Sequence, residues 1–106
     1  MRASLSGVIA AIATPITADY KPDQERFLKL GRHLLDNGCD ALNVLGTTGE
    51  ATSFALQDRL DLMTKAAGTL ERARMMVGTG ASALGDAIRL TQIGRASCRE
   101  RVFRTV

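Results

Sequence analysis

The sequence of 106 residues has only two cysteines, no tryptophan and no long apolar run. Cys39 and Cys98 are too few for a disulfide framework, so we expect a protein of a reducing compartment, the cytoplasm. No apolar stretch reaches the length of about 18 residues that a membrane-spanning helix needs, so no membrane partner is expected. With 45% hydrophobic residues, the chain has the composition of one modest globular domain.

The excess of positive charge is confined to the end of the chain. The formal net charge is +3, but residues 1–92 contain ten Lys and Arg against ten Asp and Glu. Residues 93–106 hold four arginines and one glutamate, and they supply the whole excess. Because nucleic-acid binding needs basic residues gathered on a folded surface, no nucleic-acid partner is predicted.

Three apolar runs alternate with three amphipathic stretches. The runs are continuously apolar, as is typical of strands buried on both faces of a parallel sheet. Strands are therefore predicted at residues 8–14, 41–45 and 75–77. Helices are predicted to start after Asp23, near Leu56 and near Ala83. This alternation predicts an α/β fold with right-handed crossovers.

The most informative motif directly follows the second apolar run. It consists of Gly46, Thr47, Thr48, Gly49 and Glu50, here named the 46–50 turn. A strand that ends in this turn presents two hydroxyls and several free main-chain N–H groups at one edge of the sheet. Such donors suit a small anion, for example a carboxylate. Glu50 is expected to hold the loop through hydrogen bonds to main-chain N–H groups.

A threonine recurs at the end of each apolar run. Thr14, Thr47 and Thr79 follow one another at intervals of 33 and 32 residues. Such a period, with one strand and one helix in each unit, is typical of (β/α)8 barrels, in which the chemistry lies at the carboxyl ends of the strands. Because such a barrel needs roughly 250 residues, the chain is expected to form its first three βα units, truncated. For Thr14 and Thr79, a purely structural role at a strand end is the simpler interpretation.

Two common cofactor motifs are absent. Ala83 stands where a dinucleotide fingerprint that begins at Gly78 and Gly80 needs its third glycine. No Gly-Lys-Ser or Gly-Lys-Thr follows the 46–50 turn, which excludes a Walker phosphate loop. His33 is predicted to be an exposed or partly packed residue of the first helix and not a catalytic one, and Cys39 is predicted to be buried and inert.

Together the motifs resemble the opening of the dihydrodipicolinate synthase/N-acetylneuraminate lyase family of pyruvate-dependent class I aldolases. The resemblance covers residues 5–92. It rests on residues 7–15 (GVIAAIATP), on the 46–50 turn and on the Gly-Thr-Gly of residues 78–80, in order and at matching spacing. It implies a (β/α)8 barrel, usually a homotetramer, in which a lysine of the sixth strand forms a Schiff base with pyruvate. It also implies that the full enzyme uses neither an organic cofactor nor a metal ion.

The resemblance also implies roles for the turn. Thr47 and Thr48 would bind the carboxylate of pyruvate, and Thr47 would join a catalytic proton relay. Gly46, Gly49 and Glu50 would shape the loop. Such neutral donors fix a carboxylate without a cation that would compete with the developing iminium.

The best single label within the family is dihydrodipicolinate synthase, a lyase of lysine biosynthesis that joins pyruvate and aspartate semialdehyde. Thr47, where neuraminate lyases usually have serine, favours this label. The alternative is a 2-keto-3-deoxy sugar acid aldolase or an N-acetylneuraminate lyase-like enzyme. A third interpretation, from another class, is a small stand-alone α/β binding domain.

Several positions depart from the family pattern. Lys21, Lys29 and Lys65 lie in a predicted loop and on predicted helices, so the Schiff-base lysine is expected beyond residue 106 and the chain alone is expected to be inactive. Ala55 stands where the family usually has a serine before the second helix. The lysine feedback pocket of some synthases uses a histidine and an asparagine, where this chain has Leu56 and Ser82. Only its acid, here Asp86, matches, and inhibition by lysine is therefore not expected.

The end of the chain breaks the pattern. After Gln92 no clean helical stripe continues, and no fourth strand is expected where the period would place one. Residues 93–106 resemble the family nowhere. We therefore predict an N-terminal barrel part at residues 1–92 and a foreign or frameshifted basic tail at 93–106.

Overall fold

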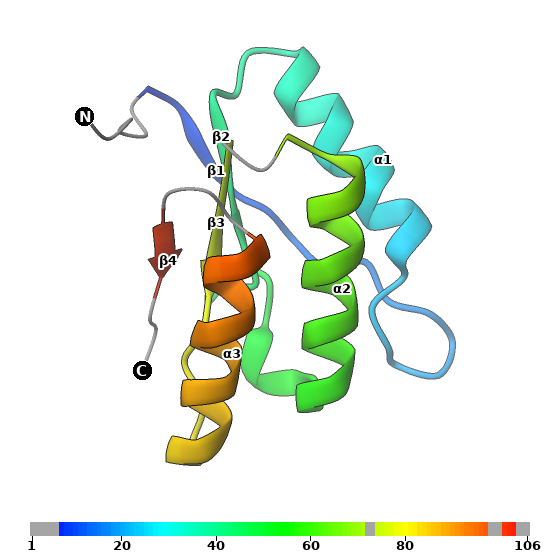
Figure 1. Cartoon of the computed structure of the whole chain (residues 1–106). Helices are drawn as coiled ribbons and strands as arrows, with labels where there is room; N and C mark the ends of the chain where they lie inside the picture. Colours follow the sequence, from blue (N-terminus) through cyan, green and yellow to red (C-terminus); the bar gives the residue numbers. More distant parts are fainter. Residues whose placement is uncertain (1–6, 72–73, 98–100, 104–106) are drawn as a thin grey trace, which may run out of the picture.

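A computed structural model describes residues 7–71, 74–97 and 101–103. Strands and helices alternate along the chain (Figure 1). The strands are β1 (Ile9–Ala11), β2 (Ala41–Val44), β3 (Met75–Gly78) and β4 (Arg101–Phe103). The helices are α1 (Gln24–Asp36), the short 3-10 helix η1 (Ala51–Ser53), α2 (Leu56–Thr69) and α3 (Leu84–Ser97). The predicted βα order is confirmed.

All strands pair in parallel, in the order β1-β2-β3-β4. The three α-helices lie on the same side of the sheet (Figure 1). Leu42 and Val44 of β2 belong to the buried core between sheet and helices, together with Phe27 of α1 and Met63 of α2. Gly31 allows α1 to pack closely against Leu70 and against Leu42 of β2. The Cβ of a larger residue there would lie 3.0 Å from Leu70 Cδ1 and 3.2 Å from Leu42 Cδ1.

The helix ends follow local chemistry. Asp23 is the N-cap of α1, as predicted, and its side chain accepts a hydrogen bond from the main-chain N–H of Arg26 at 3.1 Å. After α1, Gly38 adopts a φ of 108°, in the left-handed region that favours glycine. Helix α2 begins at an N-cap, Ala55, whose side chain makes no capping hydrogen bond.

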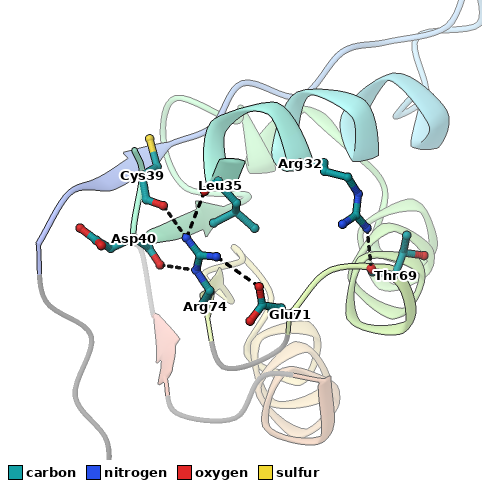
Figure 2. Close-up of polar contacts among 7 residues, drawn as sticks. All are labelled: Arg32, Leu35, Cys39, Asp40, Thr69, Glu71 and Arg74. Atoms are coloured by element: carbon teal, nitrogen blue, oxygen red, sulfur yellow. Dashed lines mark hydrogen bonds and ion pairs between the residues drawn. The ribbon is translucent and has the colours of Figure 1, made fainter. Parts of the chain in front are cut away.

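Arg74 ties three elements together at the amino edge of the sheet (Figure 2). Its guanidinium donates to the main-chain oxygens of Cys39 at 2.6 Å, Asp40 at 2.8 Å and Leu35 at 3.3 Å. It also pairs with Glu71 at 3.2 Å. Leu35 lies in the last turn of α1, and Cys39 and Asp40 lie between α1 and β2. A residue just before β3 therefore fixes the connection between the first two units.

The end of the described chain differs from the sequence prediction. Helix α3 does not stop near Gln92 but continues to Ser97, because buried Leu90 and Gly94 and half-buried Ile93 extend its packed stripe. A short strand, β4, nevertheless pairs with β3 in parallel, and it begins at Arg101, earlier than the period of 32 or 33 residues would place it. A strand of three residues is too short for hydrophobic periodicity to reveal. The domain boundary at residue 92 stays a prediction.

Candidate active site

The carboxyl ends of β1, β2 and β3 meet at one edge of the sheet, because the three strands are parallel. The 46–50 turn follows β2 at this edge and packs against the chain beyond β1. A side chain at Gly49 would lie 3.1 Å from both Thr14 Oγ1 and the main-chain oxygen of Ile12. Any larger residue at position 49 would therefore force one of the two strand ends to shift.

The 46–50 turn follows one residue in the left-handed conformation and ends on another. Leu45 has a φ of 55° and Glu50 a φ of 54°. A bulky residue adopts this conformation at a cost of about 1–3 kcal/mol, and such strain gathers at functional sites. Within the turn, the Glu50 N–H donates to the Thr47 carbonyl at 3.0 Å. The main chain thus closes the loop, and the side chain of Glu50 makes no capping hydrogen bond to η1.

The two threonines of the turn point outward from a buried frame. Leu45, Gly46 and Gly49 are buried, whereas Thr47 and Thr48 are exposed. Both residues lie where the turn leaves the carboxyl edge of the sheet. This arrangement can hold a small anion with neutral donors.

The end of β3 packs directly against the turn. A side chain at Gly78 would overlap the main-chain carbonyl oxygen of Leu45, so β3 and the residue that begins the turn are in contact. Thr79 is fully buried, in keeping with the structural interpretation of this threonine. Its neighbours Gly78 and Gly80 are buried as well.

Asn43 is a neighbour of the turn that sequence reasoning missed. It pairs with Ala11 of β1 and Met76 of β3, and its Nδ2 lies 2.9 Å from where a side chain on Gly46 would begin. Its Oδ1 is buried without a hydrogen-bond partner among the described residues, and so is Thr14 Oγ1. The signal was present, since Asn43 is the one polar residue in the run 41–45.

Arg59 of α2 is a second residue that sequence reasoning missed. It is 3% exposed, and its guanidinium donates to the main-chain oxygens of Gly80 at 2.8 Å and Gly78 at 3.1 Å. Burial lowers the pKa of Arg59 below its usual value, and the negative charge of Asp86 acts in the opposite direction. No local pattern marks this arginine, because its partners lie about twenty positions further along the chain.

A cavity of about 220 Å³ opens beside Arg59. Leu56, Ser82 and Asp86, the residues at the three positions that correspond to a lysine feedback pocket in some synthases, all lie in its wall. The structure thus brings these three positions together in one cavity wall, where Leu56 is apolar and Ser82 has a short side chain.

Other predicted features are placed as follows. His33 is exposed on α1, as predicted, where its Nδ1 lies 3.3 Å from Asn37 Nδ2. Cys39 is half-buried rather than buried, because it lies in the connection between α1 and β2. Within the described ranges, no group of His, Cys, Asp and Glu residues has the arrangement of a metal site. Among the described helices, none has the length and apolar character to cross a membrane.

Comparison with known proteins identifies the family of the chain. The model of the dihydrodipicolinate synthetase family matches residues 4–100. The chain belongs to this family. The 4-hydroxy-tetrahydrodipicolinate synthase of Mycolicibacterium paratuberculosis is 36% identical over 93 residues, which are 85% of this chain and 30% of that relative. The family match extends past Gln92, where the resemblance was expected to end.

Solved structures agree with the fold. The prophage protein YagE of E. coli K12, a member of the dihydrodipicolinic acid synthase family solved with pyruvate, superposes with a TM-score of 0.85 at 27% identity, over 95% of this chain and 35% of that chain. A two-residue variant of the 2-keto-3-deoxygluconate aldolase of Sulfolobus solfataricus gives a TM-score of 0.80 at 26% identity, over 92% and 32%. The chain thus has the fold of the N-terminal part of a (β/α)8 barrel and spans about a third of its relatives' length.

Proposed function

We propose that this chain is the N-terminal part of a pyruvate-dependent class I aldolase and supplies the turn that binds the carboxylate of pyruvate. The observation that carries the proposal is the 46–50 turn itself. It presents exposed Thr47 and Thr48 on a buried and strained frame at the carboxyl edge of a parallel sheet. The solved structure of YagE with pyruvate supports this ligand.

The chemistry needs a lysine outside this chain's described part. Lys21, Lys29 and Lys65 are exposed, in a loop, on α1 and on α2, and none follows a strand. A Schiff-base lysine must lose its proton near neutral pH, which requires a desolvated position. Its amine condenses with the keto carbon of pyruvate and releases water. The resulting iminium loses a methyl proton to give an enamine, which attacks an aldehyde.

In this scheme the turn has two roles. Thr47 and Thr48 donate hydrogen bonds to the carboxylate, which orients the keto carbon toward the lysine. Their neutrality leaves the positive iminium without a competing cation. Thr47 also passes protons during formation and breakdown of the Schiff base. The whole enzyme is proposed to be a cytoplasmic homotetramer.

The two candidate functions differ in the second substrate. The names of the curated relatives favour 4-hydroxy-tetrahydrodipicolinate synthase, with aspartate semialdehyde as the aldehyde. The likeness to a 2-keto-3-deoxygluconate aldolase favours cleavage of a sugar acid as the alternative. Residues that choose between these substrates are expected in later βα loops.

A borohydride trapping experiment tests the proposal. In one enzyme, here named the barrel chimera, residues 1–92 of this chain replace the matching segment of the Mycolicibacterium paratuberculosis synthase. Pyruvate and borohydride should leave a pyruvyl adduct on one lysine of the barrel chimera and none on the isolated chain, as mass spectrometry detects. A stoichiometric adduct on the isolated chain would contradict the proposal, and so would a folded chimera that forms none.

The isolated residues 1–92 address the stand-alone interpretation. A small binding domain should unfold cooperatively as a monomer when its circular dichroism is followed on heating. A barrel part buries too little apolar surface by itself and should unfold without a cooperative transition, or aggregate.

A further inference from the structure

Arg59 connects the start of α2 with the end of β3. Helix α2 begins six residues after the 46–50 turn, and Arg59 lies in its first turn. Its two terminal nitrogens reach the carbonyl oxygens of Gly80 and Gly78, at 2.8 and 3.1 Å. These two oxygens flank Thr79, so one guanidinium fixes the whole 78–80 segment.

The placement of this guanidinium is costly. Arg59 is almost completely buried, and its Nε has no hydrogen-bond partner among the described residues. Burying a charge is unfavourable unless its donors are satisfied, and here one donor is not. The nearby negative charge of Asp86 offsets part of this cost. A buried arginine with incomplete pairing is a poor device for general stability, and its contacts are better explained by the position that they enforce.

That position leads back to the turn. Gly78, held by Arg59, packs against the carbonyl oxygen of Leu45. Leu45 is the strained residue from which the 46–50 turn departs. The turn connects β2 to α2. Arg59 of α2 binds Gly78, and Gly78 contacts Leu45, the residue just before the turn. These contacts therefore link the two ends of the turn.

We infer that Arg59 is a positioning residue for the binding of pyruvate. It acts through Gly78 and Leu45, not by touching the substrate, and it keeps Thr47 and Thr48 at the place where the carboxylate binds. The inference rests on the proposed function of the turn. It predicts that loss of Arg59 weakens the binding of pyruvate and leaves the aldehyde site unaffected.

Steady-state kinetics of the barrel chimera test the inference. Arg59→Met should raise KM for pyruvate about tenfold or more, the scale of effect that a small misplacement of binding groups produces. KM for the aldehyde should not change. In Arg59→Lys, KM for pyruvate should lie between the values of the unsubstituted chimera and of Arg59→Met, because an ammonium can reach one of the two carbonyls but cannot span both. Arg89→Met is the matched control, because Arg89 is exposed on α3 and should leave both constants unchanged.

The outcomes separate positioning from stability. Active sites are counted by borohydride trapping, so a variant that is only less stable shows fewer sites with an unchanged KM for pyruvate, and this result would overturn the inference. If Arg59→Met does not fold, Arg59→Lys decides, since an unchanged KM in that variant overturns the inference as well. Restoration of KM in Arg59→Ala by added guanidinium ion would support it, because the adjoining cavity gives access to the vacated position.

Failure of the proposed function has a different signature. If Thr47→Val and Thr48→Val also leave KM for pyruvate unchanged, the turn does not bind pyruvate and the proposed function itself is wrong. If the threonine variants change KM and the Arg59 variants do not, only the role of Arg59 is refuted.

Discussion

The main-chain carbonyl oxygen of Leu45 occupies the space that a side chain on Gly78 would need. This contact joins the end of β3 to the first residue of the loop that carries Thr47 and Thr48. Both partners are main-chain groups, which cannot move aside as a flexible side chain does. The position of the loop is therefore sensitive to any substitution at residue 78.

The first prediction concerns Gly78. In the barrel chimera, Gly78→Ala should destabilise the fold by about 1–3 kcal/mol, the usual cost of overpacking. It should also raise KM for pyruvate, since relief of the overlap moves Leu45. Gly68→Ala is the matched control, because Gly68 lies near the end of α2 with open space around it and should gain up to about 1 kcal/mol. Thermal unfolding and kinetics measure both effects, and equal behaviour of the two variants would contradict the prediction.

The second prediction concerns the N-cap of α2. Ala55 has the extended main chain of an N-cap, with φ −64° and ψ 154°, but its side chain cannot accept a hydrogen bond. Ala55→Ser should stabilise the protein by about 0.5–2 kcal/mol, because a serine hydroxyl satisfies a free N–H of the first turn. Denaturant unfolding measures the gain. Ala55→Val adds bulk without an acceptor, so a similar gain in that variant would refute the capping explanation.

The third prediction concerns Arg74. Its side chain is 30% exposed and donates to three main-chain oxygens and one carboxylate. Arg74→Ala should cost about 2–3 kcal/mol, because it leaves half-buried carbonyls at the end of α1 unpaired. Arg26→Ala serves as the control, since Arg26 is 75% exposed and forms only a surface pair with Asp23. That change should cost less than about 1 kcal/mol. Similar thermal midpoints for the two variants would exclude a special role for Arg74.

The fourth prediction concerns regulation by lysine. Leu56 and Ser82 give the cavity beside Arg59 an apolar and a short side chain, and Asp86 lies near the charge of Arg59. A bound lysine would find few hydrogen-bond partners there. The activity of the barrel chimera should therefore be unaffected by saturating lysine. A partial or complete inhibition curve in the presence of both substrates would show that the cavity binds lysine after all.

Local chemistry explains which features the sequence could predict. Asp23 was recognised as an N-cap because capping depends on the next three residues only. The helix and strand order followed from continuous and periodic apolar runs. Leu45 gave no such signal, since leucine rarely adopts positive φ and only the packing of β3 and the turn explains its conformation. Arg59 was missed for a related reason, because its partners Gly78 and Gly80 are brought to it by tertiary structure.

The fifth prediction separates the two threonines of the turn. Each of Thr47→Val and Thr48→Val removes one hydroxyl at nearly constant shape. If both hydroxyls bind the carboxylate, each change should raise KM for pyruvate about tenfold, since a hydrogen bond to a charged group is worth about 1.5–3 kcal/mol. Thr47→Val should in addition lower kcat, because the same hydroxyl passes protons during Schiff-base chemistry.

Thr52→Val is the control for these variants, because Thr52 is exposed on η1, only a few residues beyond the turn. It should leave both constants unchanged. A loss of kcat in Thr48→Val equal to that in Thr47→Val would remove the distinction between holding and proton transfer. A loss in Thr52→Val of the same size would mean that the effects come from the fold of the loop and not from the two hydroxyls. The ratio of the changes in KM and kcat across the three variants therefore decides which atoms of the turn contact pyruvate.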